Sequence, residues 1–246
     1  MNILVTGASG GIGQAIAEYL LSNKAIVGIH YNQHNSFVST IAKKYPNRVF
    51  LFQQNLMHLN EIPEFMDEVI DKMGYIDTLV NNAGVAISSD MSGPDDSWIR
   101  DWKYTMDVNL NAAGILCKKV IQHFISRDKG GKIINMSSRA AFRGDTEDYI
   151  AYAASKAGMV ALTRSIARAY GKKNIIAFTI APGFVKTDMA QQFFDQYGKD
   201  IVLSQIALNT LTTPQDVAPF VGFLASGLAD HATGGTFDLN AGSYVH

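Results

Sequence analysis

Residues 2–13 read NILVTGASGGIG, an apolar run that passes directly into a glycine-rich turn. The apolar residues at 3–5 are typical of a buried strand. Three glycines follow with the spacing Gly7-x3-Gly11-x-Gly13, and they allow a tight turn and a close approach of the backbone to a bound group. The stretch therefore predicts a first strand that turns at once into a helix beginning near residue 11.

The rest of the chain repeats this pattern, because short β-branched runs alternate with longer helical stretches. Several runs are apolar at most consecutive positions, which is typical of strands covered by helices on both faces. The alternation predicts an α/β fold with a doubly wound parallel sheet and right-handed crossovers. In such a sheet a ligand binds beyond the carboxyl ends of the strands. We expect strands at 2–6, 25–31, 48–54, 76–81, 131–137, 174–181 and 235–239, and helices at 11–23, 35–45, 61–73, 97–125, 151–170 and 214–226.

The composition is that of a globular protein, since 47% of the 246 residues are apolar and 17% are charged. We expect a single domain over residues 1–246. The net charge of −1 provides no field that would recruit nucleic acid or an anionic membrane. The sequence shows no run of the roughly 20 apolar residues that a membrane span needs, and no metal-ligand spacing of cysteine and histidine. The N-terminus lacks a signal-peptide pattern and Cys117 is the one cysteine, so a reducing, cytoplasmic location is expected.

The glycine turn has two interpretations. Any tight strand-to-helix turn uses glycine, but the N–H groups and positive dipole end of the following helix also suit a pyrophosphate. Its place after the first strand and before an amphipathic helix favours dinucleotide binding. A second turn signal, NNAG at 81–84, is either an ordinary loop or a place where Asn82 ties neighbouring strands together while Ala83 and Gly84 pass close to the cofactor.

Six motifs occur in order along the chain: TGxxxGxG at 6–13, NNAG at 81–84, Asn109 in VNL, Ser138 in NMSS, Tyr152-x-x-x-Lys156, and PGFVKTDM at 182–189. Together they resemble the short-chain dehydrogenase/reductase family, and within it the 3-oxoacyl-[acyl-carrier-protein] reductases. The resemblance covers essentially the whole chain. It implies a Rossmann-type three-layer sandwich with a seven-stranded parallel sheet, a nicotinamide cofactor, carbonyl–alcohol chemistry and a homotetramer.

One predicted helix carries a phenol and an ammonium on the same face. Within YIAYAASKAG at 149–158, Tyr152 and Lys156 are four residues apart, which places them about 40° apart around the helix and about 6 Å apart along it. Tyr149 nearly shares that face but lies a turn further from Lys156. The helical geometry and the family motif both favour Tyr152 as the functional phenol.

The resemblance implies a role for each of four side chains. Tyr152 acts as the general acid, and Lys156 lowers the pKa of the phenol and binds the nicotinamide ribose. Ser138 hydrogen-bonds the substrate oxygen, and Asn109 holds a water that links Lys156 to solvent. Ser138 and Asn109 also have structural interpretations, as the end of a strand and as a polar residue in a long helix.

One spacing departs from the family pattern. Ser138 lies fourteen residues before Tyr152, where the family usually has thirteen, and counting back thirteen residues reaches Arg139. Since an arginine cannot replace the serine hydroxyl, we expect an insertion in the loop AFRGDTEDYIA at 141–151, which can absorb one residue. Ser137 is the alternative serine.

The end of the second predicted strand, GIHYNQHNS at 28–36, bears on the choice of cofactor. NAD-preferring Rossmann proteins usually place Asp or Glu there, where the carboxylate repels a 2′-phosphate. No carboxylate occurs between Glu18 and Glu61, and Asn32, His34 and Ser36 suit a phosphate. The sequence therefore favours NADP(H), with NAD(H) as the alternative.

Two residues count against a strict transfer of that preference. Gly10 stands where many NADP-dependent relatives have a basic residue, and Asn55 stands where relatives commonly have an aspartate that contacts the adenine.

The resemblance places Pro182 and Gly183 beneath the nicotinamide ring. We expect the cofactor to contact Gly7, Ser9, Gly11, Ile12, Gly13, Asn32, Asn55, Leu56, Asn82, Ala83, Gly84, Tyr152, Lys156, Pro182, Gly183, Val185 and Thr187.

Several substrates fit the sequence. The leading hypothesis is a small carbonyl or alcohol of the 3-oxoacyl thioester type, and the alternatives are a sugar, polyol or steroid, or a catalytically idle sensor or scaffold that binds nucleotide. The segment from Asp188 to Leu208 either covers the substrate or packs as ordinary helices, with an apolar stripe of Met189, Phe193, Phe194 and Ile201. An acyl carrier protein is a candidate partner for five basic residues that also suit solvated helix ends: Arg127, Lys129, Lys132, Lys172 and Lys173.

Overall fold

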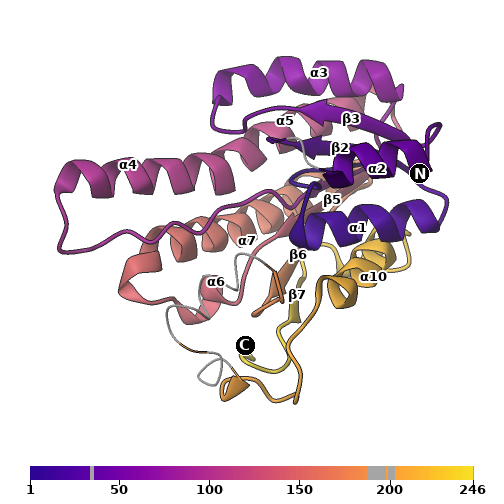
Figure 1. Cartoon of the computed structure of the whole chain (residues 1–246). Coiled ribbons are helices and arrows are strands. Elements are labelled where there is room, and N and C mark those ends of the chain that lie inside the picture. Colours follow the sequence, from indigo (N-terminus) through magenta and orange to yellow (C-terminus); the bar gives the residue numbers. More distant parts are fainter. Residues whose placement is uncertain (34–35, 188–197, 199–202, 246) are drawn as a thin grey trace.

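The computed structural model describes residues 1–33, 36–187, 198 and 203–245 (Figure 1). Seven parallel strands form one sheet in the order β3-β2-β1-β4-β5-β6-β7, which confirms the Rossmann-type sheet predicted from the sequence. From β1 the chain adds β2 and β3 on one side and then crosses to place β4 on the other side, so the connections reverse between β1 and β4. The strands are β1 (Asn2–Val5), β2 (Ile26–Tyr31), β3 (Val49–Gln53), β4 (Thr78–Asn81), β5 (Gly131–Met136), β6 (Ile175–Pro182) and β7 (Thr236–Leu239).

Helices cover both faces of the sheet (Figure 1). Helices α1, α2 and α10 cover one face, and α3, α5 and α7 cover the other. The helix predicted at 97–125 contains an interruption, because a π-helical turn at Asp107–Asn111 joins α4 to α5. The helices are α1 (Gly11–Ser22), α2 (Ser36–Lys44), α3 (Ile62–Met73), α4 (Asp95–Met106), α5 (Ala112–Ser126), α6 (Ala140–Arg143), α7 (Ile150–Tyr170) and α10 (Pro214–Ala225).

Two apolar cores form because successive residues of a strand point to opposite faces of the sheet. In β1, Ile3 and Val5 lie in the core beneath α1 and α10, whereas Leu4 lies in the core beneath α3 and α5. All three side chains are fully buried. Burial on both faces explains why the strands appear in the sequence as continuous apolar runs.

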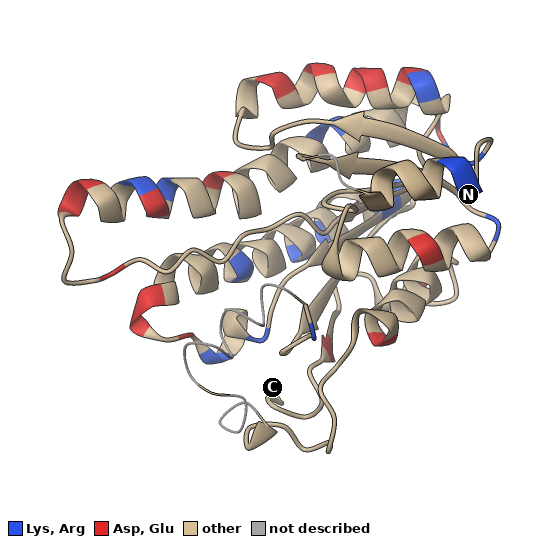
Figure 2. Cartoon of the chain, viewed as in Figure 1, with Lys and Arg blue, Asp and Glu red and all other residues tan. Residues whose placement is uncertain are grey.

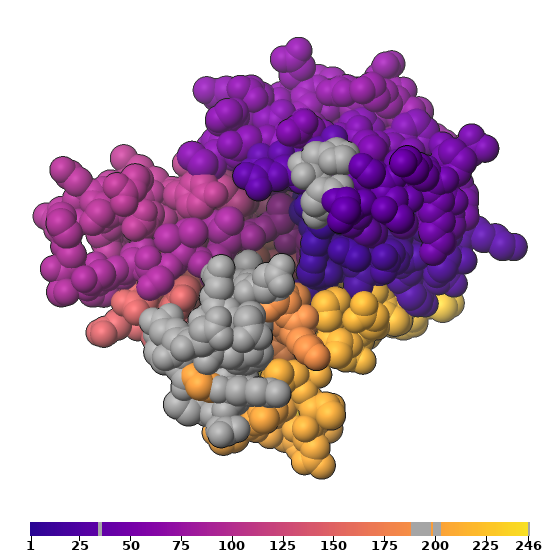
Figure 3. Space-filling view, in the orientation of Figure 1, coloured from indigo at the N-terminus to yellow at the C-terminus, as the bar shows by residue number. Residues whose placement is uncertain are grey.

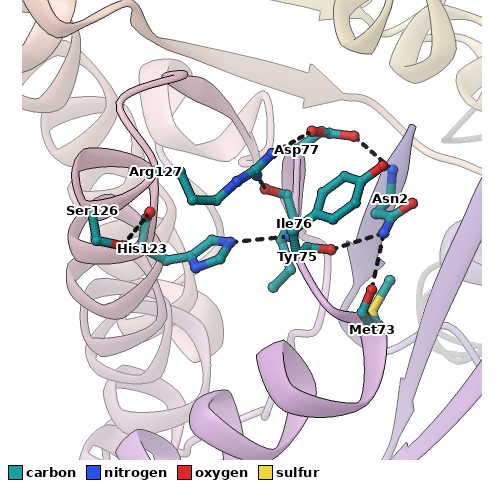
Figure 4. A network of polar contacts seen from close by, with 8 residues as sticks. All are labelled: Asn2, Met73, Tyr75, Ile76, Asp77, His123, Ser126 and Arg127. Atoms are coloured by element: carbon teal, nitrogen blue, oxygen red, sulfur yellow. Dashed lines mark hydrogen bonds and ion pairs between the residues drawn. The ribbon is translucent and has the colours of Figure 1, made fainter.

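A polar network closes the amino end of the sheet (Figure 4). The Asn2 N–H donates to the Asp77 carboxylate at 2.9 Å, and the Asn2 side-chain amide donates to the Tyr75 carbonyl at 3.0 Å. The Arg127 guanidinium donates to the Ile76 carbonyl at 2.6 Å and lies 3.6 Å from the Asp77 carboxylate. These contacts join β1, the turn before β4 and the end of α5 at the amino end of the strands, opposite to the carboxyl ends.

Charged residues lie mainly on the outer sides of the helices, with both signs mixed along α4 (Figure 2). In the described part of the chain, no helix has the length and apolar character to cross a membrane. The same residues contain no cluster of three or more histidine, cysteine or acidic side chains that could hold a metal ion.

Candidate active site

A cavity of about 680 Å³ lies beyond the carboxyl ends of the central strands, where the connections of the sheet reverse. The surface is hollowed there, between the magenta residues of α4 and the indigo N-terminal residues (Figure 3). The residues expected to contact the cofactor all line this cavity, with the exception of Gly13. Among the four expected catalytic residues, Ser138, Tyr152 and Lys156 line the cavity, and Asn109 lies behind its wall.

The glycine turn after β1 is tied to the turn after β4 by one side chain. The Asn82 amide donates to the carbonyls of Thr6 and Gly7 at 2.9 and 3.1 Å. The Thr6 hydroxyl in turn accepts the backbone N–H groups of Asn82 and Ala83 at 2.9 and 3.0 Å. Gly7 has a φ of +62°, and a Cβ on it would lie 2.8 Å from the Ala83 Cα, so the contact requires glycine.

The first turn of α1 fits a pyrophosphate. A Cβ on Gly13 would lie 2.3 Å from the Gly7 carbonyl oxygen, so Gly13 packs beneath the turn and allows the helix to begin there. At the helix start, Gly10 is extended and provides no side-chain cap for the first N–H groups. The backbone of Gly10 and Gly11 lines the cavity, so these N–H groups and the positive end of the helix dipole are positioned for an anion.

His30, which the sequence reasoning did not select, supports the same turn from β2. Its Nδ1 accepts the Gly7 N–H at 3.0 Å, and its Nε2 lies 3.0 Å from the Gln54 carbonyl, to which it donates. The ring is almost fully buried and meets Phe65 edge-on. Burial lowers the pKa of His30 to about 4, so the ring is neutral at pH 7 and keeps the lone pair that the Gly7 N–H requires.

The end of the cavity beside β2 and β3 is uncharged. Asn32, Gln33, Asn55 and Leu56 line it, and no described acidic side chain lines this end. His34, one of the residues expected to suit a phosphate, lies outside the described residues.

The phenol, the serine hydroxyl and the ammonium meet at the centre of the cavity. Tyr152 and Lys156 share one face of α7, as their spacing predicts, and the Lys156 Nζ lies 5.7 Å from the centre of the Tyr152 ring. The Tyr152 hydroxyl is hydrogen-bonded to the Ser138 side chain. The Lys156 ammonium is buried and donates to the Met136 carbonyl at 3.0 Å.

The pKa of Tyr152 differs from the sequence-based expectation. We expected Lys156 to lower the pKa of the phenol, but the structure raises it, chiefly because the surrounding protein removes the phenol from water. The hydrogen bond with Ser138 opposes this shift, and the negative charge of Asp145 adds to it. Burial also lowers the pKa of Lys156 to about 8.

The two serines at the end of β5 have different contacts. The Ser137 hydroxyl donates to the Lys156 carbonyl at 2.7 Å and so braces α7. The Ser138 hydroxyl accepts the Ala140 N–H at 3.1 Å and is the one that reaches Tyr152. The fourteen-residue spacing still brings Ser138 to Tyr152, because the intervening chain folds into α6 and a 3₁₀ turn at Glu147–Tyr149.

The Asn109 side chain is committed to protein contacts. It lies in the π-helical turn, where its amide accepts the Val85 N–H at 2.8 Å and donates to the Ser155 hydroxyl at 3.0 Å. It also donates to the Val85 carbonyl at 2.9 Å. These contacts fasten the loop after β4 to α7, directly behind Lys156.

The segment after β6 forms the wall opposite the glycine turn. Pro182, Gly183, Val185 and Thr187 all line the cavity. A Cβ on Gly11 would lie 3.3 Å from the Thr187 methyl group, so the two walls approach closely here. The apolar stripe expected to cover the substrate lies outside the described residues, since 188–197 and 199–202 are not described.

Two arginines and a carboxylate, none of them assigned a role from the sequence, line the cavity beside Ser138. They are Arg139, Arg143 and Asp145, and the rings of Tyr104 and Phe184 also line the cavity. Arg143 lies 3.9 Å from the Asp145 carboxylate. The sequence signal that could have drawn attention to this group is the basic residue directly after Ser138.

The family model described as short chain dehydrogenase matches residues 1–198. The chain is 35% identical over 239 residues to Nodulation protein G of Rhizobium sp. (strain N33), a match that covers 97% of this chain and 95% of that protein. It is 32% identical over 248 residues to the 3-oxoacyl-[acyl-carrier-protein] reductase FabG of Aquifex aeolicus (strain VF5), with 98% and 96% covered.

The fold is similar to a crystal structure from Agrobacterium tumefaciens whose description proposes a gluconate dehydrogenase. The TM-score is 0.89 and the sequence identity is 27%, and the match covers 100% of this chain and 96% of that one.

His30 should make the stability of the protein depend on mildly acidic pH. Because the pKa of His30 is about 4 in the folded protein and 6.5 in the unfolded chain, the unfolded state binds more protons between these values. The free energy of unfolding should therefore fall by about 3 kcal/mol from this residue as pH decreases from 6.5 to 4. Urea unfolding at several pH values measures this dependence.

His30→Gln provides the matched control for this measurement, because glutamine retains a donor and an acceptor but does not titrate. Between pH 6.5 and 4, the difference in unfolding free energy between the two proteins should change by most of the expected decrease of about 3 kcal/mol. Parallel pH profiles for the two proteins would contradict the assignment.

Proposed function

The chain belongs to the short-chain dehydrogenase family and is an NAD(P)-dependent oxidoreductase of carbonyl or CH–OH groups, and we propose that Tyr152 exchanges the proton with the substrate oxygen while Ser138 holds that oxygen. The observation that carries this proposal is the hydrogen bond between the Tyr152 phenol and Ser138 above the buried Lys156 ammonium. A catalytically idle nucleotide-binding scaffold would not need these three groups together.

The two pKa shifts suit reduction of a carbonyl. The raised pKa of Tyr152 keeps the phenol protonated at neutral pH, so it is ready to donate its proton to an oxygen that gains negative charge. The Ser138 hydroxyl donates a second hydrogen bond to that oxygen. The Lys156 ammonium then stabilises the phenolate that remains. Asn109 positions this centre through Ser155 and Val85, and a water relay at Asn109 remains part of the proposal.

Apart from Gly13, the expected cofactor residues line the cavity on both sides, from the glycine turn to the segment after β6. The glycine turn and α1 would hold the pyrophosphate, Lys156 the nicotinamide ribose, and the residues from Pro182 to Thr187 the nicotinamide. When bound, the nicotinamide supplies or accepts the hydride. We propose NADP(H) as the preferred form, because the end of the cavity beside Asn32 has no carboxylate among the described residues.

Two substrate classes have support. A 3-oxoacyl thioester is supported by the names of the reductases that this chain resembles. A sugar acid or a related polyol is supported by the solved dehydrogenase with the similar fold. Both classes place a carbonyl or alcohol at Ser138 and Tyr152, so both are consistent with the proposed proton transfer.

Acyl carrier protein has weaker support from the residues expected to contact it. Arg127 is used within the network at the amino end of the sheet, and Lys132 lies 3.5 Å from Asp230. These residues precede or begin β5, whereas Ser138 follows its carboxyl end. The proposal therefore concerns the acyl thioester rather than its carrier. A cytoplasmic location, expected from the N-terminal sequence and the single cysteine, and a homotetramer, expected from the resemblance, are also proposals.

Paired substitutions test the assignment of the acid and of the serine. Tyr152→Phe should lower kcat by roughly 10²-fold or more and leave cofactor binding intact, because only the proton donor is lost. Tyr149→Phe should have a far smaller effect. Ser138→Ala should cost roughly 10²-fold in kcat, and Ser137→Ala should cost less because its hydroxyl faces the α7 backbone. Steady-state kinetics with NADPH measure all four, and a more severe loss from Tyr149→Phe or Ser137→Ala would reject the assignment.

The titration of Lys156 should make the rate of reduction fall at basic pH. Because its pKa is lowered to about 8, the ammonium loses its charge as pH rises through this value, and the phenolate loses its stabilising cation. The kcat/KM for reduction should therefore be flat at neutral pH and fall above about pH 8. The control is Lys156→Arg, whose guanidinium stays charged, and any residual activity of this variant should persist to higher pH. If kcat/KM of the variant fell at the same pH as in the parent protein, the decrease would be assigned to another group.

The NADP(H) preference is tested by adding the missing carboxylate. Asn32→Asp should lower kcat/KM for NADPH by roughly 10²-fold through repulsion of the 2′-phosphate, with little loss for NADH. The neutral Asn32→Ser should retain the preference of the parent protein. A parent protein that already prefers NADH would overturn the proposal.

A further inference from the structure

Arg139 is a buried cation in the wall of the catalytic cavity. It directly follows Ser138, and only 4% of its surface is exposed. Its guanidinium lies 4.2 Å above the centre of the Phe184 ring, and its Nη2 donates to the Gln205 side chain at 3.2 Å. Its Nη1 is fully buried and has no hydrogen-bond partner among the described residues.

The charges around this guanidinium do not balance. The charged groups that act on it are Arg143, which repels it, and Asp145, which attracts it. Asp145 also lies 3.9 Å from Arg143 and accepts the Thr146 N–H at 3.0 Å. One carboxylate is therefore shared between two guanidinium groups, and among the described residues a net positive charge remains at this place in the wall of the cavity.

A buried cation without a full set of partners is costly, so its presence requires a reason. An arginine with a purely structural role would donate its N–H groups to backbone carbonyls, as Arg127 does at the amino end of the sheet. The Arg139 guanidinium instead makes one hydrogen bond among the described residues, to the neutral Gln205, and lies over the Phe184 ring. Its Nη1 has no such partner, and the residue lines the cavity.

The chemistry of the guanidinium identifies the missing partner. Its planar fork of N–H donors matches the two oxygens of a carboxylate, and such paired hydrogen bonds are stronger than neutral ones. Arg139 and Ser138 both line this cavity, so an anion paired with the guanidinium would share the cavity with the carbon that reacts at Ser138. A neutral substrate would leave the buried charge unpaired.

We propose that Arg139 binds a carboxylate of the substrate, and that the protein interconverts a hydroxy acid and the corresponding oxo acid. The inference rests on the proposed function, because it takes Ser138 and Tyr152 as the groups that meet the reacting oxygen. It narrows the substrate from any carbonyl or alcohol to one that carries a carboxylate a few bonds from the reacting carbon.

Matched acids and esters test this specificity. The protein is assayed with NADPH and NADH against short 2-oxo and 3-oxo acids and their methyl esters, and in the reverse direction against the hydroxy acids, including aldonic acids. We expect kcat/KM for the best acid to exceed that of its ester by roughly 10- to 100-fold, as the loss of a charge-assisted pair implies.

Substitutions then assign the preference to Arg139. Arg139→Gln should remove the preference for the acid while leaving the ester nearly unchanged, with the loss mainly in KM, and Arg139→Lys should restore part of it. Arg143→Gln, the matched control at the second arginine of the cavity lining, should have a smaller effect. The melting temperature and NADPH binding of each variant establish that it is folded. Equal losses for acid and ester in Arg139→Gln would show a structural role and overturn the inference.

A binding measurement separates this inference from the proposed function. Propionate, which cannot be reduced, should protect the NADPH complex of the parent protein against thermal unfolding and should not protect Arg139→Gln. Turnover of neutral carbonyls with no preference for acids would overturn the inference and leave the proposed function standing. If no carbonyl in the panel consumes cofactor, the proposed function fails, and the propionate measurement alone decides whether Arg139 is a carboxylate site.

Discussion

The Asn82 side chain holds together the two turns on which the catalytic cavity depends. Its amide donates to the Thr6 and Gly7 carbonyls, and it thereby fixes the turn after β1 against the turn after β4. These strands are neighbours at the place where the connections of the sheet reverse. The Thr6 hydroxyl makes the reciprocal contacts, because it accepts the backbone N–H groups of Asn82 and Ala83. Together these hydrogen bonds position the glycine backbone relative to the loop that carries Gly84 past Lys156.

Two further buried side chains join elements on either side of these turns. His30 supports the Gly7 N–H from β2, and Asn109 fastens the loop after β4 to α7. Each of these polar side chains is buried and spans two elements that are distant in the sequence. Because a buried polar group without a partner is costly, each one favours a single arrangement of the loops. The site is preorganised by hydrogen bonds that lie behind the cavity wall.

The electrostatics of the centre follow from burial. Strand β5 positions two parts of this centre, since Ser138 lies two residues beyond the end of the strand and the Met136 carbonyl accepts a hydrogen bond from the Lys156 ammonium. Burial raises the pKa of Tyr152 and lowers that of Lys156, so each shift moves the group toward its uncharged form. Arg139, in the wall of the same cavity, retains its charge although only 4% of its surface is exposed. The cavity therefore combines a neutral proton donor with a fixed positive charge, which suits a substrate that carries a negative charge.

The sequence by itself determined the order of the elements and the position of the motifs, because strand and helix periodicity, glycine turns and the Tyr152–Lys156 spacing are local properties of the chain. It also indicated that Tyr152 shares a helical face with Lys156, since this follows from helix geometry alone. Only the tertiary structure decided which serine hydroxyl faces Tyr152, where Asn109 directs its amide, and that His30 and Arg139 are buried beside the cavity. These facts depend on burial and on partners from distant strands, and a single residue in a sequence carries neither. The pKa of Tyr152 is the clearest example, because the charge of Lys156 is visible in the sequence whereas the loss of water around the phenol exists only in the folded protein.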